Sequence, residues 1–484
     1  MGLLDRVDAL FKGPEEFDLT SGGIAKPLFF LSMPIVVTNL FQTAYNLADT
    51  FWLGQYSTDA LAAISFAFPL VFLLISLGMG ISVAGSVLVA QYTGAGEPRE
   101  AEYAASQTVT FAAIASVLLG GVGYLFVGEF LDLMGASADV LPLASSYMEV
   151  ISLGLVAMFG FAVFIALMRG YGDTITPMLV MFGSVVLNIA LDPFLIFGWG
   201  PFPALGIEGA AIATVFSRAL ALIVGLAVMF RGVRGVQINL RDMTPDASYL
   251  GRLLRIGLPA SIEGTGRAVS MNLLLFIVAL FPDPVVAAYG IGTRVFSVIF
   301  LPAIAVARGV ETMTGQNVGS GKPDRAERAA NLAAKMLFAV LSVAGVVVFL
   351  VPEPIVSVFV GADQADAGRV VAVGSQFLRI VALTFGFIGI MRAYTGSFRG
   401  AGKTLTAAAI SVLMLGVVRF PIAWVAAGRI GETGIWLSFA LSNVVGAVVA
   451  YAWYRRGRGA AATSRPGVAD ELDEPVATGE STDD

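Results

Sequence analysis

The chain has 484 residues, of which 57% are apolar and 13% are charged, and its mean hydropathy is +0.82. This composition is typical of an integral membrane protein and excludes an ordinary water-soluble globule. The chain contains no cysteine and no histidine, which excludes disulfides, thiolate metal sites and histidine-based proton transfer.

The net negative charge comes from the C-terminal end. Of 35 acidic and 29 basic residues, seven acids and one base lie in 460–484, so the rest of the chain carries 28 of each. We expect residues 457–484 to be a disordered acidic tail, because they lack apolar periodicity. At the other end, residues 1–20 place their first apolar side chains on one helical stripe, which predicts a short interfacial segment instead of a cleaved signal.

Apolar runs of about 20 residues are long enough to cross a bilayer. About twelve such runs follow one another along the chain. They cover 25–53, 60–92, 102–128, 139–168, 174–198, 207–231, 250–281, 285–316, 326–351, 366–396, 404–428 and 432–454.

Basic residues fix the predicted orientation, because cytoplasmic loops retain Lys and Arg. Every second connection is basic, whereas 53–60, 128–139, 198–207 and 281–285 contain no Lys or Arg. We therefore expect a multi-pass protein of the plasma membrane with both termini in the cytoplasm. The basic connections contain Arg99; Arg169; five arginines from Arg231 to Arg255; Lys322, Arg325 and Arg328; Arg399 and Lys403; and Arg455, Arg456 and Arg458.

The chain repeats itself. "QYTGAGEPREAE" at 91–102 returns as "QNVGSGKPDRAE" at 316–327, and "MRGYGDT" at 168–174 returns as "FRGAGKT" at 398–404. Because six spans is an even number, both copies cross the membrane in the same direction. We therefore predict an all-α membrane protein with two six-helix lobes related by a parallel pseudo-twofold axis along the membrane normal.

The expected organisation follows from this repeat. An N-terminal lobe covers 21–231, a cytoplasmic inter-lobe loop covers 232–249, and a C-terminal lobe covers 250–456. Two large lobes joined by a polar loop favour a transporter whose halves move against each other.

Several motifs resemble those of the multidrug and toxic compound extrusion (MATE) family, in its archaeal and DinF-like branch. The resemblance covers residues 20–456 and is carried by Pro34, "YNLADTFWLG" at 45–54, "QYTGAGEP" at 91–98, "RGYGDT" at 169–174, "NIALDP" at 188–193 and their second-half echoes. It implies two lobes around a cavity, and export of cationic or amphipathic organic compounds driven by inward flow of Na⁺ or H⁺.

Carboxylates inside a span are costly and need a partner or a function. Asp49 lies late in the first span, with no basic residue between Lys26 and Arg99. Asp192 lies in the fifth span, and Asn188 is four residues earlier on the same helix face. We interpret the first lobe as holding acids without basic partners.

The expected coupling site lies in the outer half of the first lobe. Residues late in the first and fifth spans reach the same depth as residues early in the fourth and sixth, so carboxylates, an amide and hydroxyl groups should lie near one another and suit Na⁺ or a proton. The MATE resemblance implies the same cation role. The predicted residues are Asp49, Asn188, Asp192, Thr214 and Tyr147, with a possible Na⁺ held by the first three, and Glu149 is equally well explained as a solvated residue.

Other roles are expected for residues nearby. Pro34 and Pro193 are predicted kink or hinge positions, because proline removes a backbone hydrogen bond from a helix. Gln42, Tyr45, Asn46 and Phe161 are expected to line the substrate cavity.

The second lobe lacks the corresponding oxygen ligands. By the repeat, Asp49, Asn188, Asp192 and Thr214 correspond to Leu274, Gly416, Phe420 and Phe439. Ion coupling is therefore expected in the first lobe. The second lobe is polar in another way, through Glu263, Arg267, Arg294, Arg379 and Arg419, and Glu263 and Arg267 are spaced to neutralise each other.

The predicted function is a monomeric secondary antiporter for small, cationic organic compounds, with Na⁺ or H⁺ as coupling ion and no cofactor. The second-lobe arginines keep open one alternative, a flippase for lipid-linked oligosaccharides or lipids. No catalytic constellation indicates an enzyme, and no filter motif indicates a channel. "GSFRGAGKT" at 396–404 has serine where a phosphate loop needs its first glycine, so neither nucleotide nor nucleic acid is expected as a partner.

Overall fold

The computed structural model describes residues 18–133, 137–232, 235–360 and 366–456, and within these ranges the chain is helical without a strand. The predicted tail and nearly all of the predicted N-terminal segment lie outside the described residues. The first lobe contains α2 (Ala25–Tyr56), α3 (Thr58–Ala95), α4 (Pro98–Leu133), α5 (Val140–Leu153), α6 (Leu155–Tyr171), α7 (Ile175–Phe197) and α8 (Gly206–Arg231).

The second lobe follows after a 3₁₀ turn at Leu240–Met243. Its helices are α9 (Ala247–Val278), α10 (Asp283–Gly319), α11 (Pro323–Leu350), α12 (Pro352–Ser357), α13 (Ala367–Ala382), α14 (Phe385–Gly400), α15 (Thr404–Val412), α16 (Phe420–Ile430) and α17 (Glu432–Arg456). A π-helical segment, Leu413–Arg419, joins α15 to α16.

Helices occupy all twelve predicted spans. In the described part of the chain, nine are long and apolar enough to cross a membrane, or eleven if each of two bent pairs forms one span. The remaining predicted span is α9, which is less apolar because it carries Glu263 and Arg267 in its middle.

Two spans that the sequence predicts as single runs are each divided into two helices. α5 and α6 meet at an angle of 54°, and α13 and α14 at 52°. The first break lies at Gly154, where a Cβ atom would come within 2.2 Å of the Val215 side chain on α8. A residue without a side chain therefore lets the bent span pack closely against its neighbour.

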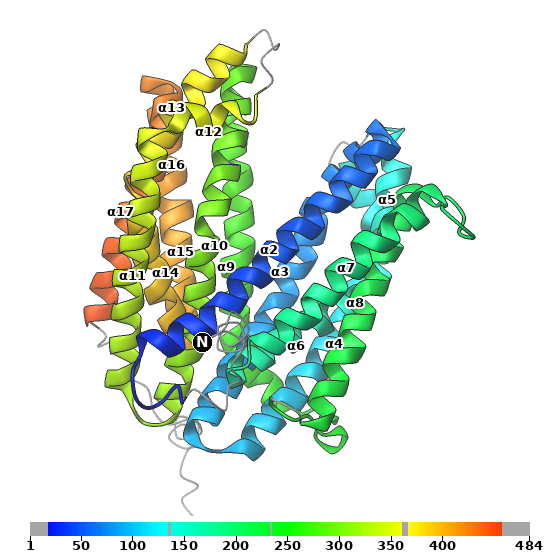
Figure 1. The fold of residues 1–484 in the computed structure, drawn as a ribbon, viewed down its shortest axis with the longest axis vertical. Helices are drawn as coiled ribbons and strands as arrows, with labels where there is room; N and C mark the ends of the chain where they lie inside the picture. The colour runs from blue at the N-terminus through cyan, green and yellow to red at the C-terminus, as the bar shows by residue number, and fades with distance from the viewer. Residues whose placement is uncertain (1–17, 134–136, 233–234, 361–365, 457–484) are drawn as a thin grey trace, which may run out of the picture.

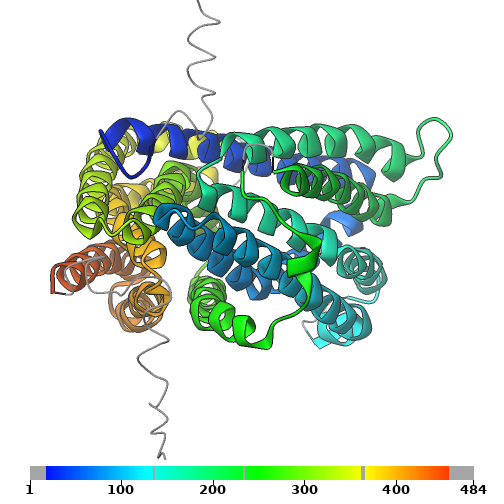
Figure 2. The same cartoon turned by 90° about the horizontal axis from the view of Figure 1, so that it is seen from below.

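The two lobes are arranged as a V (Figure 1). They lie together at one end and diverge toward the other, with α9 to α17 on one side and α3 to α8 on the other. Contacts between the lobes follow the predicted pseudo-symmetry, because α2 packs on α10 while α9 packs on α3. Figure 2 shows the closed end of the V from below, where helices from both lobes meet.

The first helix of each lobe begins on the other lobe. At the start of α2, the Arg325 guanidinium donates hydrogen bonds to the carbonyl oxygens of Leu19, Ser21, Gly22 and Gly23 at 2.5 to 3.3 Å. From there α2 runs to the far end of the first lobe (Figure 1). It therefore links the two lobes physically.

The start of α9 is held in the corresponding way by α4 of the first lobe. Tyr103 donates a hydrogen bond to the Asp246 carboxylate at 2.8 Å, and Gln107 donates to the carbonyl oxygens of Asp242 and Thr244 at 2.6 and 2.7 Å. Hydrogen bonds from Ser248 and Tyr103 lower the pKa of Asp246 to about 2. Asp246 is thus a charged N-cap at neutral pH.

The two repeated glycine loops meet at the closed end of the V. A Cβ atom on Gly94 would lie 2.0 Å from the carbonyl oxygen of Gln316, and one on Gly319 would lie 1.9 Å from that of Gln91. Gln91 also donates a hydrogen bond to the carbonyl oxygen of Gly400 at 3.0 Å. Only glycine permits this close approach of the two backbones. We call the contact of Gly94 with Gln316 and of Gly319 with Gln91 the glycine gate.

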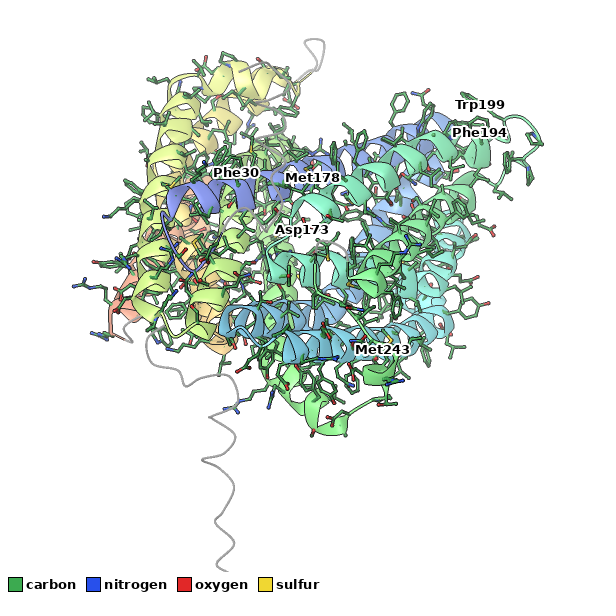
Figure 3. The ribbon with its side chains drawn as sticks, turned by 60° about the horizontal axis from the view of Figure 1, so that its bottom comes forward. Phe30, Asp173, Met178, Phe194, Trp199 and Met243 are labelled. Atoms are coloured by element: carbon green, nitrogen blue, oxygen red, sulfur yellow. The ribbon has the colours of Figure 1, made fainter. Side chains whose placement is uncertain are left out.

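Aromatic side chains gather at the opposite end of the first lobe. Trp199 makes ring contacts with Trp52, Phe194 and Phe197. Figure 3 shows Phe194 and Trp199 at this end and Met243 at the other. Exposed aromatic rings of this kind are typical of the boundary between bilayer and water.

Candidate functional site

The centre of the first lobe holds two buried carboxyl groups in contact. Asp49 on α2 and Asp192 on α7 are 4% and 0% exposed, and their carboxyl groups are close enough to share a hydrogen bond. Asn188, one turn earlier on α7, donates a hydrogen bond to Asp192 at 3.3 Å. Two carboxylates in such contact repel each other unless a proton or another cation lies between them.

Hydroxyl groups from two further helices surround this pair. The Tyr45 hydroxyl lies 2.8 Å from that of Thr214 on α8. Tyr147 on α5 is buried and lies within electrostatic range of both aspartates. The structure thus brings together all five residues that the sequence places in the coupling site.

The site retains unused oxygen atoms. One oxygen each of Asp49, Asn188 and Asp192 is buried and has no hydrogen-bond partner in the described part of the chain. Because a buried polar atom without a partner is costly, these oxygens are suited to bind a cation or to take up a proton. Hard cations such as Na⁺ are bound by oxygen atoms of this kind.

Arg218 adds a nearby positive charge to the first-lobe acids, although among the described residues it forms no ion pair with Asp49 or Asp192. It lies on α8, is buried, and interacts electrostatically with Asp49. Its guanidinium carbon lies 5.0 Å from the centre of the Tyr45 ring. Arg218 interrupts the apolar run 207–231, so a search of the predicted spans for charged residues would have found it.

The residues expected to line the substrate cavity lie around Arg218. Gln42 accepts a hydrogen bond from Arg218 at 2.9 Å and donates one to Asn46 at 3.2 Å. The Phe161 ring lies 5.4 Å from the guanidinium and is buried. These side chains form a polar and aromatic layer beside the carboxyl pair.

The two predicted hinge prolines lie inside continuous helices. Pro34 is in α2 and Pro193 is in α7. The Thr38 hydroxyl donates a hydrogen bond to the carbonyl oxygen of Pro34 at 2.8 Å. This bond is made to the carbonyl of the proline itself, so it does not replace the backbone N–H that Pro34 lacks, which in a regular helix would bond the carbonyl of Phe30.

The second lobe contains an arginine near the place that corresponds to the carboxyl pair. Arg419 directly precedes Phe420, the repeat counterpart of Asp192, and donates hydrogen bonds to Ser442 and Asn443 at 2.8 and 2.9 Å. Its guanidinium lies 4.3 Å from the centre of the Phe439 ring. A permanent cation thus occupies the second lobe where the first lobe has two acids.

A second charged cluster lies between the lobes. Glu263 on α9 accepts two hydrogen bonds from Arg399 of α14 at 3.0 and 3.1 Å, and one from Ser411 at 2.9 Å. Arg267 is a longer partner at 3.4 Å. The expected neutralisation of Glu263 by Arg267 is therefore only part of the arrangement, since Arg399 is its closer partner.

Three members of this cluster were not singled out from the sequence. On α10, Glu311 accepts hydrogen bonds from Arg399 at 3.1 Å and from Arg308 at 3.0 Å. Arg392 lies on α14, and like the other two it interrupts a predicted span. Charged residues inside the predicted apolar spans 285–316 and 366–396 could have identified these members from the sequence.

Comparison with protein families links this arrangement to membrane transporters. The MatE family model matches residues 34–194 and 259–425, which together include the central part of both lobes. The chain is similar to the "FAD transporter" of Shewanella oneidensis, with 27% identity over 90% of this chain and 95% of that protein. It is 29% identical to the "Probable multidrug resistance protein NorM" of Thermotoga maritima, over 86% of this chain and 88% of that protein.

Solved structures share the fold. A MATE protein in its straight conformation superposes with a TM-score of 0.84 and 25% identity, covering 92% of this chain and 98% of that one. An outward-facing multidrug resistance MATE family transporter superposes with a TM-score of 0.83 and 25% identity, covering 94% of this chain and 100% of that one.

Proposed function

The chain belongs to the MatE family, and from this premise we propose that it exports amphipathic organic compounds in exchange for Na⁺ or H⁺ by alternating access. Its relatives are multi-pass membrane transporters, and it is a transporter and not an enzyme. Multidrug efflux proteins among these relatives support drug export, and they do not favour the lipid flippase alternative.

The observation that carries the proposal is the contact between Asp49 and Asp192. At this site a cation neutralises the mutual repulsion of the carboxylates, and its departure restores that repulsion. The ion is therefore bound in one state of the transporter and released in another. The three unpartnered oxygens of Asp49, Asn188 and Asp192 supply the ligands.

Helix α2 connects cation binding in the first lobe to the second lobe. Its start is bound to the second lobe through Arg325, whereas Asp49 lies in the first lobe. Between these points Pro34 interrupts the helical hydrogen bonds and allows the angle of α2 to change. Cation binding at Asp49 thereby alters how the lobes sit against each other, and by linkage substrate binding must affect cation affinity by the same factor.

The closed end of the V faces the cytoplasm in this proposal, because the loops on that side carry the Lys and Arg residues. Both termini then lie in the cytoplasm of a plasma-membrane monomer. The described conformation faces outward, ready to receive a coupling ion from outside. The glycine gate separates the interior from the cytoplasm in this state.

Uptake into inverted membrane vesicles tests the proposed function. We expect a fluorescent amphipathic compound to accumulate when a Na⁺ gradient or a pH gradient is imposed, and to stop accumulating when that gradient is collapsed. Translocation of a lipid-linked sugar without any gradient-driven uptake would instead support the flippase alternative.

The charge of the coupling site predicts one monovalent cation per cycle. Two aspartates and Arg218 sum to a single negative charge when the aspartates are ionised. We expect Arg218→Gln to bind the coupling ion roughly five- to thirtyfold more tightly, because loss of a nearby positive charge is worth about 1 to 2 kcal/mol in a medium of effective dielectric ~20. The concentration of coupling ion that gives half-maximal uptake measures this change in affinity.

The matched control is Arg231→Gln, which removes an exposed arginine from the end of the same helix. This variant should leave unchanged the concentration of coupling ion that gives half-maximal uptake. An Arg218→Gln variant with unaltered ion dependence would contradict the charge assignment.

A further inference from the structure

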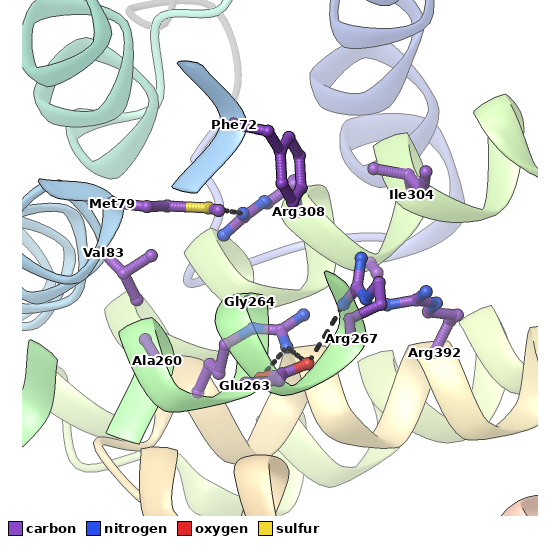
Figure 4. Close-up of a pocket in the computed structure, with 12 residues that line it drawn as sticks. Phe72, Met79, Val83, Ala260, Glu263, Gly264, Arg267, Ile304, Arg308 and Arg392 are labelled. Atoms are coloured by element: carbon purple, nitrogen blue, oxygen red, sulfur yellow. Dashed lines mark hydrogen bonds and ion pairs between the residues drawn. The ribbon is translucent and has the colours of Figure 1, made fainter. Parts of the chain in front are cut away.

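A cavity of about 80 Å³ lies between the lobes, separate from the carboxyl pair. Its walls come from α3 of the first lobe and from α9, α10 and α14 of the second. Figure 4 shows Phe72 and Met79 on the first-lobe side, facing Arg308, with Glu263, Arg267 and Arg392 on the other. Four arginines and one glutamate line this cavity, alongside apolar side chains.

The charges around the cavity do not balance. The interacting set consists of Arg169, Arg267, Arg308, Arg392 and Arg399 against Glu263 and Glu311, which leaves three positive charges. Both glutamates are almost completely buried, and their oxygens already accept hydrogen bonds from Arg399, Arg308 and Ser411. The carboxylates therefore have little capacity to neutralise the remaining guanidinium groups.

Arg392 is the member of the set with the fewest contacts. Its side chain makes no hydrogen bond or ion pair with any described residue, and its Nε atom is buried without a partner. Its guanidinium faces that of Arg267 (Figure 4), so two like charges stand next to each other. Uncompensated charge inside a membrane protein is expensive and marks a functional site.

We propose that this inter-lobe cavity binds the oxyanion group of the transported compound, of the phosphate type with at least two negative charges. Guanidinium groups match the oxygen geometry of phosphates through paired hydrogen bonds. The apolar wall formed by Phe72, Met79, Val83, Ala260 and Ile304 suits an adjoining hydrophobic part of the same molecule. A volume of about 80 Å³ has room for several water molecules and so for a group of this size.

This proposal deepens the proposed function by naming a substrate class, and it replaces the expectation of cationic substrates. That expectation came from the resemblance to the MATE family, whereas the arginines that line this cavity favour an anionic group. Because the cavity is shared by both lobes, movement of the lobes changes the distance between its walls. The bound anion would therefore be released when the lobes rearrange.

Equilibrium binding tests the proposal without requiring transport. The purified full-length chain is placed in phosphatidylcholine nanodiscs and titrated calorimetrically with inorganic pyrophosphate. We expect saturable binding that Arg392→Gln weakens at least tenfold, because one unshared guanidinium is lost. Arg392 pairs with no carboxylate, so the variant should fold, which its thermal unfolding temperature verifies.

The matched control is Arg294→Gln, an exposed arginine of α10 outside the cavity, which should change the affinity less than twofold. Absence of pyrophosphate binding, or equal weakening by the two variants, would overturn the proposal. Gradient-driven uptake of an amphipathic cation with no anion binding would leave the proposed antiport intact and reject only the oxyanion site.

Nanodiscs that contain phosphatidic acid distinguish the source of the anion. If this lipid abolishes pyrophosphate binding, the cavity takes a phosphate headgroup from the bilayer. If pyrophosphate binds as before, the group arrives on a water-soluble compound. Either result supports the same recognition chemistry by the arginines.

Discussion

Asp49→Asn and Asp192→Asn are each expected to reduce gradient-driven uptake to the level of vesicles that lack the protein. Asparagine has nearly the shape of aspartate but carries no charge. One remaining aspartate beside Arg218 makes the site electrically neutral, so it no longer attracts a cation. The measurement is initial uptake of an amphipathic substrate into inverted vesicles under the gradient that drives the wild type.

Two controls make this result specific. Glu129→Gln removes an exposed carboxylate from α4 and should leave uptake unchanged. The double variant Asp192→Asn with Arg218→Gln restores a single negative charge at Asp49, and we expect it to regain measurable cation binding. Undiminished uptake in both single aspartate variants would remove the coupling site proposed here.

Gly94→Ala and Gly319→Ala are expected to open the end of the V that the glycine gate closes. Each new Cβ atom would lie only 2.0 or 1.9 Å from a carbonyl oxygen of the other lobe, which is far inside van der Waals contact. Backbone atoms cannot rotate away from such a contact, so the lobes must separate. Overpacking of this kind costs about 1 to 3 kcal/mol, which shifts a two-state equilibrium between five- and 150-fold.

Cysteine accessibility measures the predicted shift. The natural chain has no cysteine, so Ala90→Cys places a single thiol on α3 next to the gate, where Ala90 is buried. We expect a membrane-impermeant maleimide to label this thiol at least fivefold faster in either glycine variant, while uptake falls. Gly121→Ala, at a position with no atom within 4 Å of the new Cβ, is the control. Equal labelling rates in all variants would show that the gate does not control access.

Sequence reasoning predicted the two-lobed fold and proposed the coupling residues, because each rested on a strong local signal. The repeat at 91–102 and 316–327 predicts the pseudo-symmetry, and the unusual acids in the first and fifth spans identify Asp49 and Asp192. Their contact depends on the relative rotation of α2 and α7, which apolar periodicity does not determine. The orientation of the termini and the roles of the site residues remain predictions that the experiments above address.

The charged cluster between the lobes was harder to predict. Arg399 and Arg169 stand at helix ends and count as topology signals in the sequence, although the structure places them beside Glu311. Which acid pairs with which arginine depends on α9, α10 and α14 meeting at one place. Sequence spacing within α9 alone favoured Arg267 as the partner of Glu263, and a residue 136 positions later is closer.

The crossing of the first helices has a consequence for biosynthesis. The hydrogen bond from Arg325 to Leu19 joins residues 306 positions apart, so the start of α2 has no final anchor until about two thirds of the chain has been made. The N-terminal half cannot complete its assembly as it leaves the ribosome, although N-terminal units usually fold first. If the chain is divided at the inter-lobe loop, each half expressed alone should therefore be degraded. The two halves expressed together should stabilise each other.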